Sequence, residues 1–278
     1  MFRYKNLSSG STGNATLVEA NNPVGKPSRV LVDCGTRLAR LLELLAIADV
    51  LPSEIDAIFI THEHSDHIGC VTQLALRYSI PVWASQGTHA ALQDMQGKLR
   101  AKQSTHSQLL PKFADFEALV RIATDMCPIA LGDLQLNPFT VPHDAREPLQ
   151  LTCTDGNTKL GILTDLGHAS RHVIEQLAGC NALLLESNHD EEMLINSKYP
   201  AFLKARVGGD FGHLSNTQAA EVLRCVMHGN LRRVSAAHLS QQNNRPSLAQ
   251  SALAQVLGCM PAEIVAACPE MGTPWMAV

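Results

Sequence analysis

The nine residues 61–69, Thr-His-Glu-His-Ser-Asp-His-Ile-Gly, place three histidines and two acids within six positions. They directly follow the apolar run Ile-Asp-Ala-Ile-Phe-Ile, which is typical of a buried strand. Imidazole and carboxylate groups are ligands of zinc and similar divalent ions, so such a cluster predicts a metal site. Because alternate side chains of an extended chain point the same way, His62 and His64 can converge on one ion. Asp66 and His67 follow where the chain turns, and we expect them to face a second ion.

The composition is that of an ordinary globular protein, with 278 residues of which 45% are hydrophobic and 17% charged. No repeat, low-complexity linker or break in composition divides the sequence, so we predict one domain over residues 1–278. The formal net charge of −4 argues against the basic surplus that a nucleic-acid coat usually shows. A local basic groove remains compatible with this balance.

Small basic groups occur at three places: Lys98 with Arg100 and Lys102, Lys204 with Arg206, and Arg232 with Arg233. Such groups are usually solvated surface, and contact with a phosphate is the less favoured alternative for each of them.

The eight cysteines are scattered without a Cys-x-x-Cys pair, which predicts reduced, buried thiols in a cytosolic protein. The N-terminal residues Met-Phe-Arg-Tyr-Lys-Asn lack the apolar core of a signal peptide. No run approaches the ~20 apolar residues that span a bilayer. We therefore expect a cytoplasmic protein that has no membrane segment.

A second pattern is the position of polar residues relative to the predicted strands. Apolar strand-like runs alternate with helical stretches, which indicates helices laid against a sheet. Loops at one rim of a sheet are where a rigid scaffold gathers functional groups. Potential metal ligands or acids stand at the end of six predicted strands: Asp33, His62, His143, Asp165, Glu186 and His238.

The sequence also predicts the structure of three further segments. The glycine-rich loop 7–14 either brings backbone N–H groups near the active site or only makes a tight turn, and it is not a Walker P-loop because no Gly-Lys-Ser/Thr follows. A helix is expected from about residue 68 to 78, directly after the histidine cluster. The polar residues 97–107 are interpreted as a loop over the site.

The order of these motifs resembles that of the metallo-β-lactamase-fold hydrolases and, within that superfamily, of the YycJ/WalJ-type proteins. The core His62-x-His64-x-Asp66-His67 is specific to the superfamily. The resemblance to the YycJ/WalJ type rests on motifs that follow in order through nearly the whole chain: Ser8–Asn14, Thr61–Gly69, Glu186–Asp190, Gly212–Asn216, His238–Ser240 and Asn243-Asn244. It implies an α/β fold, a four-layer αβ/βα sandwich with the metals at the strand ends where the two sheets meet.

The same resemblance implies two divalent metal ions. One would be held by His62, His64 and His143. The other would be held by Asp66, His67 and His238, with Asp165 bridging both. Asp33 matches the family's first-motif aspartate, which does not bind the metal itself but orients the histidine ligands or supports the structure around them. A set of five histidines and two aspartates suits Zn²⁺ and Mn²⁺ alike.

The last third of the chain is similar to ribonuclease Z, in which a glutamate supports a histidine of a His-Ser-Thr motif near the scissile phosphate. Glu186 and His213-Leu-Ser215 occupy matching places, although the chain has His-Leu-Ser instead of His-Ser-Thr and Asn188-His189 after the glutamate. The chain lacks the long arm of that family and the extra domain of the β-CASP nucleases. Ser215, Asn216 and the start of the following helix are predicted to bind a phosphate of the substrate.

Asp66, His213 and Glu186 are the predicted catalytic residues. Two ions about 3.5–4 Å apart lower the pKa of a shared water, so that a bridging hydroxide can attack a phosphodiester. A protonated His213, paired with Glu186, would either donate to the leaving oxygen or hold the oxygens of the pentacoordinate phosphorus.

These features predict a dinuclear-metal phosphodiesterase, and the resemblance implies 5′→3′ trimming of DNA ends. The net charge of −4 fits a nuclease that binds DNA weakly or is recruited by a partner. An alternative is a small-molecule hydrolase of the same fold, acting on a thioester, a lactone or a cyclic phosphodiester. Glu186 and His213-Leu-Ser215 favour the phosphodiester over the thioester. A second alternative, a non-catalytic metal-binding regulatory module, requires a lost ligand, and none is lost.

The histidines outside these motifs are interpreted as ordinary polar groups, namely His89, His106, His172 and His228. His168 and His189 fit the metal pocket and an ordinary polar environment equally well.

Overall fold

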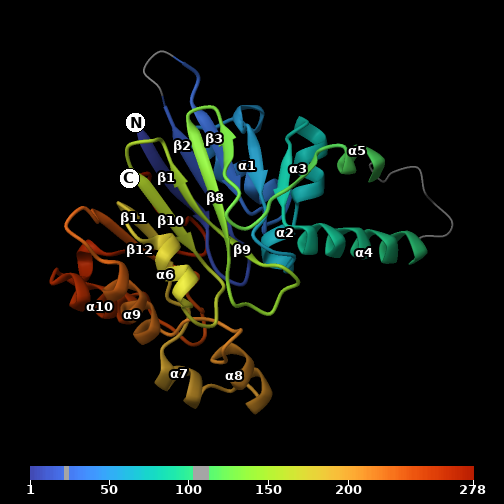
Figure 1. Cartoon of the computed structure of the whole chain (residues 1–278). Coiled ribbons are helices and arrows are strands. Elements are labelled where there is room, and N and C mark those ends of the chain that lie inside the picture. The colour runs from blue at the N-terminus through green and yellow to red at the C-terminus, as the bar shows by residue number, and fades with distance from the viewer. Residues whose placement is uncertain (22–24, 103–112) are drawn as a thin grey trace.

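The computed structural model describes residues 1–21, 25–102 and 113–278, and it describes only the backbone of 96–102 and 113–114. Within this part of the chain the strands form two seven-stranded sheets (Figure 1). The first sheet has the order β14 (Met276–Ala277), β1 (Phe2–Ser8), β2 (Ala15–Ala20), β3 (Ser28–Val32), β4 (Ala57–Phe59), β5 (Val82–Ala84) and β6 (Val120–Ile122). The second has the order β13 (Val265–Ala266), β12 (Arg233–Ala237), β11 (Ala182–Glu186), β10 (Lys159–Leu163), β9 (Leu149–Thr154), β8 (Leu134–Thr140) and β7 (Ile129–Leu131).

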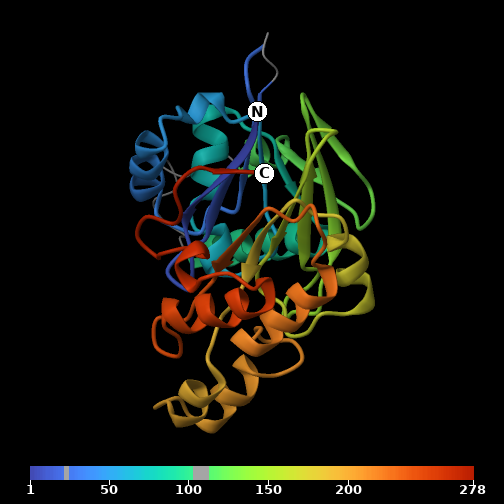
Figure 2. The ribbon, with the colours of Figure 1, turned by 90° about the vertical axis from the view of Figure 1, so that its left-hand side faces the viewer.

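Helices cover the outer face of each sheet, and the two sheets face each other (Figures 1 and 2). The first sheet is covered by α1 (Leu38–Ile47), α3 (Val71–Tyr78), α4 (Gln86–Lys102) and α5 (Phe113–Glu117). The second is covered by α6 (Arg171–Leu177), α9 (Asn216–Val226) and α10 (Pro246–Leu257). Short 3₁₀ turns lie at Pro52–Glu54 and Pro261–Glu263. The predicted four-layer αβ/βα sandwich is therefore confirmed.

The apolar residues of the strands account for this layering. Strands β2 and β3 are buried along their whole length, because alternate side chains enter the cores on the two faces of the first sheet. Leu17 and Leu31 pack under helix α1, whereas Val18 and Val30 pack between the sheets against residues such as Leu151. Each such aliphatic side chain contributes about 1.5–3 kcal/mol by leaving water, and the cores hold the strand ends in fixed positions.

The strands that precede the predicted site residues run in one direction within each sheet. Strand β3 pairs in parallel with β4, and β11 pairs in parallel with both β10 and β12. Their carboxyl ends therefore lie at one edge of the sandwich, as the strand-end pattern predicts. A short helix, α2 (Ser65–Ile68), follows β4 at this edge.

Two predicted boundaries are wrong. The helix predicted from residue 68 to 78 is interrupted, since α2 ends at Ile68 and α3 begins at Val71. The interruption brings the backbone of Gly69 against that of Gly35, where a Cβ on Gly69 would lie 2.4 Å from the Gly35 carbonyl oxygen. The predicted loop 97–107 is helical up to Lys102 in α4, and its remainder lies outside the described residues.

Two more helices, α7 (Glu191–Asn196) and α8 (Ala201–Val207), lie between β11 and α9. They project from the sandwich at the end away from the two termini (Figures 1 and 2). Among the described residues, no helix combines the length and apolar character needed to cross a bilayer.

Candidate metal centre

Three of the strand-end residues have a left-handed backbone conformation. Asp33, Asp165 and His238 have φ values of 63°, 55° and 55°. This left-handed region is uncommon for residues other than glycine. Each of the three follows a buried strand closely, so packing of the strand holds the strained residue in place.

The ring nitrogens of His62, His64 and His143 converge at the first position. His62 Nε2 lies 3.0 Å and His143 Nε2 lies 3.3 Å from His64 Nδ1. A tetrahedral ion with metal–nitrogen bonds of 2.0–2.1 Å separates its nitrogen ligands by about 3.3–3.4 Å. The spacing of the three nitrogens therefore fits a single divalent ion.

The atoms of Asp66, His67, His238 and Asp165 converge next to the first group. His67 Nε2 lies 3.6 Å from Asp66 Oδ2 and 3.1 Å from Asp165 Oδ2. His238 Nε2 lies 3.8 Å from Asp66 Oδ2 and 3.5 Å from Asp165 Oδ1. The two carboxylate oxygens of Asp165 thus face both histidines of this second position.

Hydrogen bonds behind the rings orient the histidines. The Nδ1–H of His67 donates to Asp33 Oδ2 at 2.8 Å, and that of His238 donates to Glu186 Oε1 at 2.9 Å. The Nδ1–H of His143 donates to the carbonyl oxygen of Gly212 at 3.1 Å. Because these oxygens only accept, each Nδ1 carries a proton and each Nε2 faces the cluster, the arrangement found around metal-binding histidines.

The charge balance of the cluster also fits divalent cations. Burial lowers the pKa of His238, but the surrounding carboxylates of Asp165, Asp66 and Glu186 outweigh burial and raise this pKa to about 10. Burial likewise opposes the charge of His67, and Asp165 and Asp33 raise its pKa well above the ordinary value. His238 Nε2 and Asp165 Oδ2 are buried, and neither makes a hydrogen bond of regular geometry with a described residue, although Asp66 Oδ2 lies 3.8 Å from the first and His67 Nε2 3.1 Å from the second. A cation at this place would satisfy both atoms and take over the role of the protons.

Glu186 connects the second position to His213. The fully buried Glu186 carboxylate accepts from the Nδ1–H of His213 at 2.9 Å as well as from His238. Burial raises the pKa of Glu186, but the nearby charge and hydrogen bonds of His213 and His238 bring it down to about 2. Burial lowers the pKa of His213, and Glu186 outweighs this effect and raises it. The pair with Glu186 therefore favours the protonated form of His213, and the Nε2 of this ring is left for the pocket.

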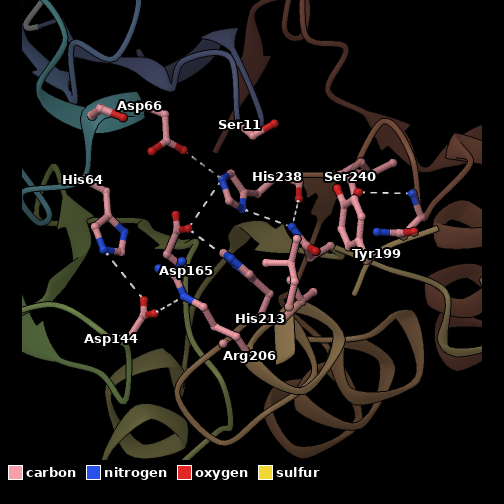
Figure 3. Close-up of a pocket in the computed structure, with 17 residues that line it drawn as sticks. Ser11, His64, Asp66, Asp144, Asp165, Tyr199, Arg206, His213, His238 and Ser240 are labelled. Atoms are coloured by element: carbon pink, nitrogen blue, oxygen red, sulfur yellow. Dashed lines mark hydrogen bonds and ion pairs between the residues drawn. The ribbon is translucent and has the colours of Figure 1, made fainter. Parts of the chain in front are cut away.

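A cavity of about 350 Å³ opens over these side chains (Figure 3). His64, Asp66, Asp165 and His238 line it from the loops after strands, and His213 lines it from the loop between α8 and α9. The opposite wall comes from the segment that carries α7 and α8, including Tyr199 and Arg206. The pocket is thus open to a substrate directly beside the histidine and aspartate cluster.

Sequence reasoning missed two polar residues of this pocket. Asp144 lies 3.8 Å from His64 Nε2 and accepts from Arg206 Nε at 2.6 Å (Figure 3). The position of Asp144 directly after His143 was the available signal. Arg206 was assigned to solvated surface, and no local pattern placed it at the pocket. The side chains of the basic group Lys98, Arg100 and Lys102 lie outside the described residues.

The predicted phosphate ligands Ser215 and Asn216 do not line this pocket. Ser215 caps α9, where its hydroxyl accepts from the N–H of Gln218 and donates to Glu191 at 2.9 Å. The side chain of Asn216 exchanges two 2.9 Å hydrogen bonds with Asn244. Both side chains fix the loop that carries His213, and their contact with substrate stays a prediction.

The two histidines left open lie outside the cluster. His168 is exposed and its ring contacts the carbonyl oxygen of Asp210 at 2.9 Å. His189 is buried beside Ser215 in a neighbouring hollow. The glycine-rich loop 7–14 does lie at the site, since the side-chain amide of Asn14 is 3.0 Å from His67 Nε2.

Comparison with known proteins agrees with this geometry. Residues 28–238 match the model of a β-lactamase superfamily domain. The chain is 33% identical over 251 residues to the exodeoxyribonuclease YycJ of Bacillus anthracis, covering 90% of this chain and 87% of that protein. It is 32% identical over 258 residues to the exodeoxyribonuclease WalJ of Streptococcus pneumoniae, covering 92% and 88%. The crystal structure of the metallo-β-lactamase fold protein YhfI from Bacillus subtilis superposes with a TM-score of 0.68 at 15% identity, covering 99% of both chains.

The fold and the cluster at its strand ends define a metal-dependent hydrolase. The chain belongs to the metallo-β-lactamase superfamily and, within it, to the YycJ/WalJ-type proteins. The predicted resemblance is thereby confirmed. The superfamily implies divalent metal ions, and the clustered histidines and aspartates are the candidate ligands.

Proposed function

We propose that this protein is a dinuclear-metal phosphodiesterase that removes nucleotides from the 5′ ends of DNA. The observation that carries the proposal is the Glu186–His213 pair, which holds the ring of His213 at the cavity beside the cluster as a hydrogen-bond donor. A phosphodiester needs such a donor, since its leaving oxygen departs as an alkoxide unless it is protonated. The names of the YycJ and WalJ relatives support DNA as the substrate.

In this proposal, His62, His64 and His143 would hold one ion. Asp66, His67 and His238 would hold the second, and Asp165 would serve both positions. Zinc and manganese each suit this donor set. Bound ions supply Lewis-acid chemistry, in that they neutralise phosphate charge and lower the pKa of water.

The protein's own groups then position the substrate and move protons. Asp66 lines the cavity and stays ionised, because His238 and His67 outweigh the effect of burial and lower its pKa. It can accept a hydrogen bond from the attacking water and hold it in line. His213 donates its Nε2 proton toward the leaving oxygen, while Glu186 fixes the ring and keeps it charged.

The test is cleavage of end-labelled DNA by the purified protein with Mn²⁺ or Zn²⁺. We expect a 5′ label to be released first as a mononucleotide and a 3′-labelled strand to shorten progressively. His64→Ala should abolish cleavage, whereas His168→Ala, at an exposed histidine outside the cluster, should retain it. Cleavage no faster than that of His64→Ala would refute the nuclease, and shortening from the 3′ end would refute the polarity.

A second assay separates this function from that of a small-molecule hydrolase with the same metal core. Bis(p-nitrophenyl) phosphate and a thioester are offered to the same metal-loaded enzyme. We expect turnover of the phosphodiester and none of the thioester, because His213 at the cavity can donate a hydrogen bond to the anionic phosphate oxygens, and a thioester carries no such oxygens. Preferred turnover of the thioester would contradict the proposal.

A further inference from the structure

Two neighbouring asparagines in the loop between β12 and α10 differ in how their side chains are satisfied. Both are buried, since the exposed fractions of Asn243 and Asn244 are 0% and 6%. The amide of Asn244 donates to the carbonyl oxygens of Ser187 at 2.7 Å and Asn188 at 3.1 Å, and it exchanges hydrogen bonds with Asn216. Neither Nδ2 nor Oδ1 of Asn243 has a hydrogen-bond partner among the described residues. A buried amide without partners costs free energy, so packing alone does not account for Asn243.

The side chain of Asn243 belongs to the cavity over the cluster. Asn243 lines this cavity together with Ser240 and Tyr199. The backbone holds the residue in place, because the carbonyl oxygen of Asn243 accepts from the N–H of Asp190 at 2.8 Å and its N–H donates to Ser240 Oγ at 3.1 Å. The amide therefore offers one donor group and one acceptor to a molecule that fills the cavity.

Tyr199 adds an aromatic ring to this cavity. The residue is half-buried, and it lies on the side of His238 that is away from His64 (Figure 3). An aromatic ring stacks on the face of a nucleobase, and a side-chain amide pairs with a donor and an acceptor on the edge of the base. A phosphate only accepts hydrogen bonds, so it would leave Oδ1 of Asn243 unpaired. The pair of side chains therefore matches a base better than a phosphate.

The size of the cavity and the chemistry of release indicate which base this is. A volume of about 350 Å³ is at the small end of the range for ligand pockets, so the cavity suits about one nucleotide. When a 5′-terminal nucleotide is released as a 5′ monophosphate, the bond between phosphorus and its 3′ oxygen breaks. This oxygen is the leaving oxygen toward which His213 would donate. The terminal nucleotide therefore lies on the His213 side of the scissile phosphate, inside the cavity that Tyr199 and Asn243 also line.

We infer that Tyr199 and Asn243 form a subsite for the base of the 5′-terminal nucleotide, in which the ring of Tyr199 stacks on the base and the amide of Asn243 hydrogen-bonds to its edge. This inference rests on the proposed function and names the part of the substrate that the cavity recognises. Rotation of the amide by half a turn exchanges its donor and its acceptor, so the subsite accepts more than one kind of base.

The test compares two DNA duplexes that differ only in the 5′-terminal unit of one strand, which is either a mismatched thymidine or an abasic tetrahydrofuran unit. Because neither unit is base-paired, the opening of the duplex end is matched. A label at the 3′ end of the same strand reports the first cleavage by the metal-loaded enzyme. We expect the wild-type kcat/KM to be about tenfold higher for the thymidine duplex, because stacking and the amide contact exist only there.

Variants of the two residues assign this difference to the subsite. Tyr199→Leu and Asn243→Leu should each reduce the tenfold ratio to about twofold or less, because each removes one of the two contacts with the base. Tyr199→Phe keeps the aromatic ring and should keep the ratio. Tyr78→Leu is the matched control, since Tyr78 is also half-buried but lies on α3, outside the cavity.

Thermal unfolding of the metal-free protein gives a second readout, which a structural role of Asn243 would move in the opposite direction. Because its amide has no partner among the described residues, the nonpolar leucine of Asn243→Leu should raise the Tm by about 2–4 °C. Asn244→Leu should lower the Tm, because the buried groups that its amide satisfies, such as the carbonyl oxygen of Ser187, would lose their partner.

The outcomes separate the subsite from the function. If the wild-type protein removes both terminal units with kcat/KM values within twofold of each other, the subsite is refuted and the nuclease stands. If the wild-type protein cleaves neither duplex, the proposed function itself is refuted. A tenfold ratio that persists in Tyr199→Leu, or a lower Tm for Asn243→Leu, would also overturn the inference, because the base would then not stack on the ring or the amide would support the fold.

Discussion

Replacing Glu186 by glutamine tests the buried charge that joins the metal centre to His213. The carboxylate accepts four hydrogen bonds, from the Nδ1–H groups of His213 and His238 and from the backbone N–H groups of Leu166 and Leu214. Glutamine keeps the shape of the side chain but exchanges one accepting oxygen for an NH₂ group. Two of the four donors therefore lose their acceptor, and the charge that balances two histidines disappears.

Two independent arguments give the size of the effect on the free energy of unfolding. A buried donor that loses its acceptor costs about 1–3 kcal/mol, so two such donors cost roughly 2–6 kcal/mol. The pKa of Glu186 is about 2 in the folded protein, against an ordinary value of 4.5. At 1.36 kcal/mol per pKa unit this difference corresponds to about 3 kcal/mol of stability at neutral pH. We expect Glu186→Gln to lose about 3–4 kcal/mol.

The assay is urea unfolding of the metal-free protein in EDTA at pH 7, followed by the fluorescence of Trp83 and Trp275. Removing metal keeps differences in metal affinity out of the comparison. The folded-state pKa of Glu186 is depressed, so its contribution is complete above pH 4.5 and is lost as the pH falls toward 2. The gap between the wild-type protein and Glu186→Gln should therefore narrow as the pH is lowered below about 4.5.

The matched control is Glu192→Gln on the exposed side of α7, which should change the free energy of unfolding by less than about 0.5 kcal/mol. A loss below 1 kcal/mol for Glu186→Gln at pH 7 would show that the buried carboxylate is not held as an ionised acceptor of four hydrogen bonds. A gap that stayed constant between pH 5 and pH 3 would contradict the depressed pKa.

Two further predictions concern the ligand set and its backbone support. Asp165→Asn should lower the affinity for Zn²⁺ at least about 100-fold in a chelator competition, because an amide places no negative charge between His67 and His238. The control Asp133→Asn, at the surface, should leave the Zn²⁺ affinity unchanged. Equal affinities would remove Asp165 from the centre. Gly35→Ala should lower the free energy of unfolding by about 3 kcal/mol in thermal unfolding, because the added Cβ would lie 1.6 Å from the Asp66 carbonyl oxygen. In the control Gly229→Ala the added Cβ meets nothing within 4 Å, so this variant should be as stable as the wild-type protein. A stable Gly35→Ala protein would mean that the Asp66 loop can move without loss.

The sequence by itself identified the candidate ligands, because each lies next to a strand whose apolar pattern is local. The cluster at 61–69 and the strand-end residues His143, Asp165 and His238 could be recognised without knowing how the strands pair. The start of α9 is also a local feature, since a helix cap depends on a few consecutive residues, and Ser215 is the capping residue. The carboxyl-end rule for parallel strands then explains why these residues meet at one edge.

Only the tertiary structure decided which side chains share the cavity. Asp144 and Arg206 meet across 62 positions of the chain, and their contact depends on how α8 packs against the loop after β8. Ser215 and Asn216 adjoin His213 in the sequence, yet their side chains turn away to bind Glu191 and Asn244. Local patterns specify where a strand or helix ends, whereas the orientation of a side chain toward a distant partner depends on the packing of the whole sandwich.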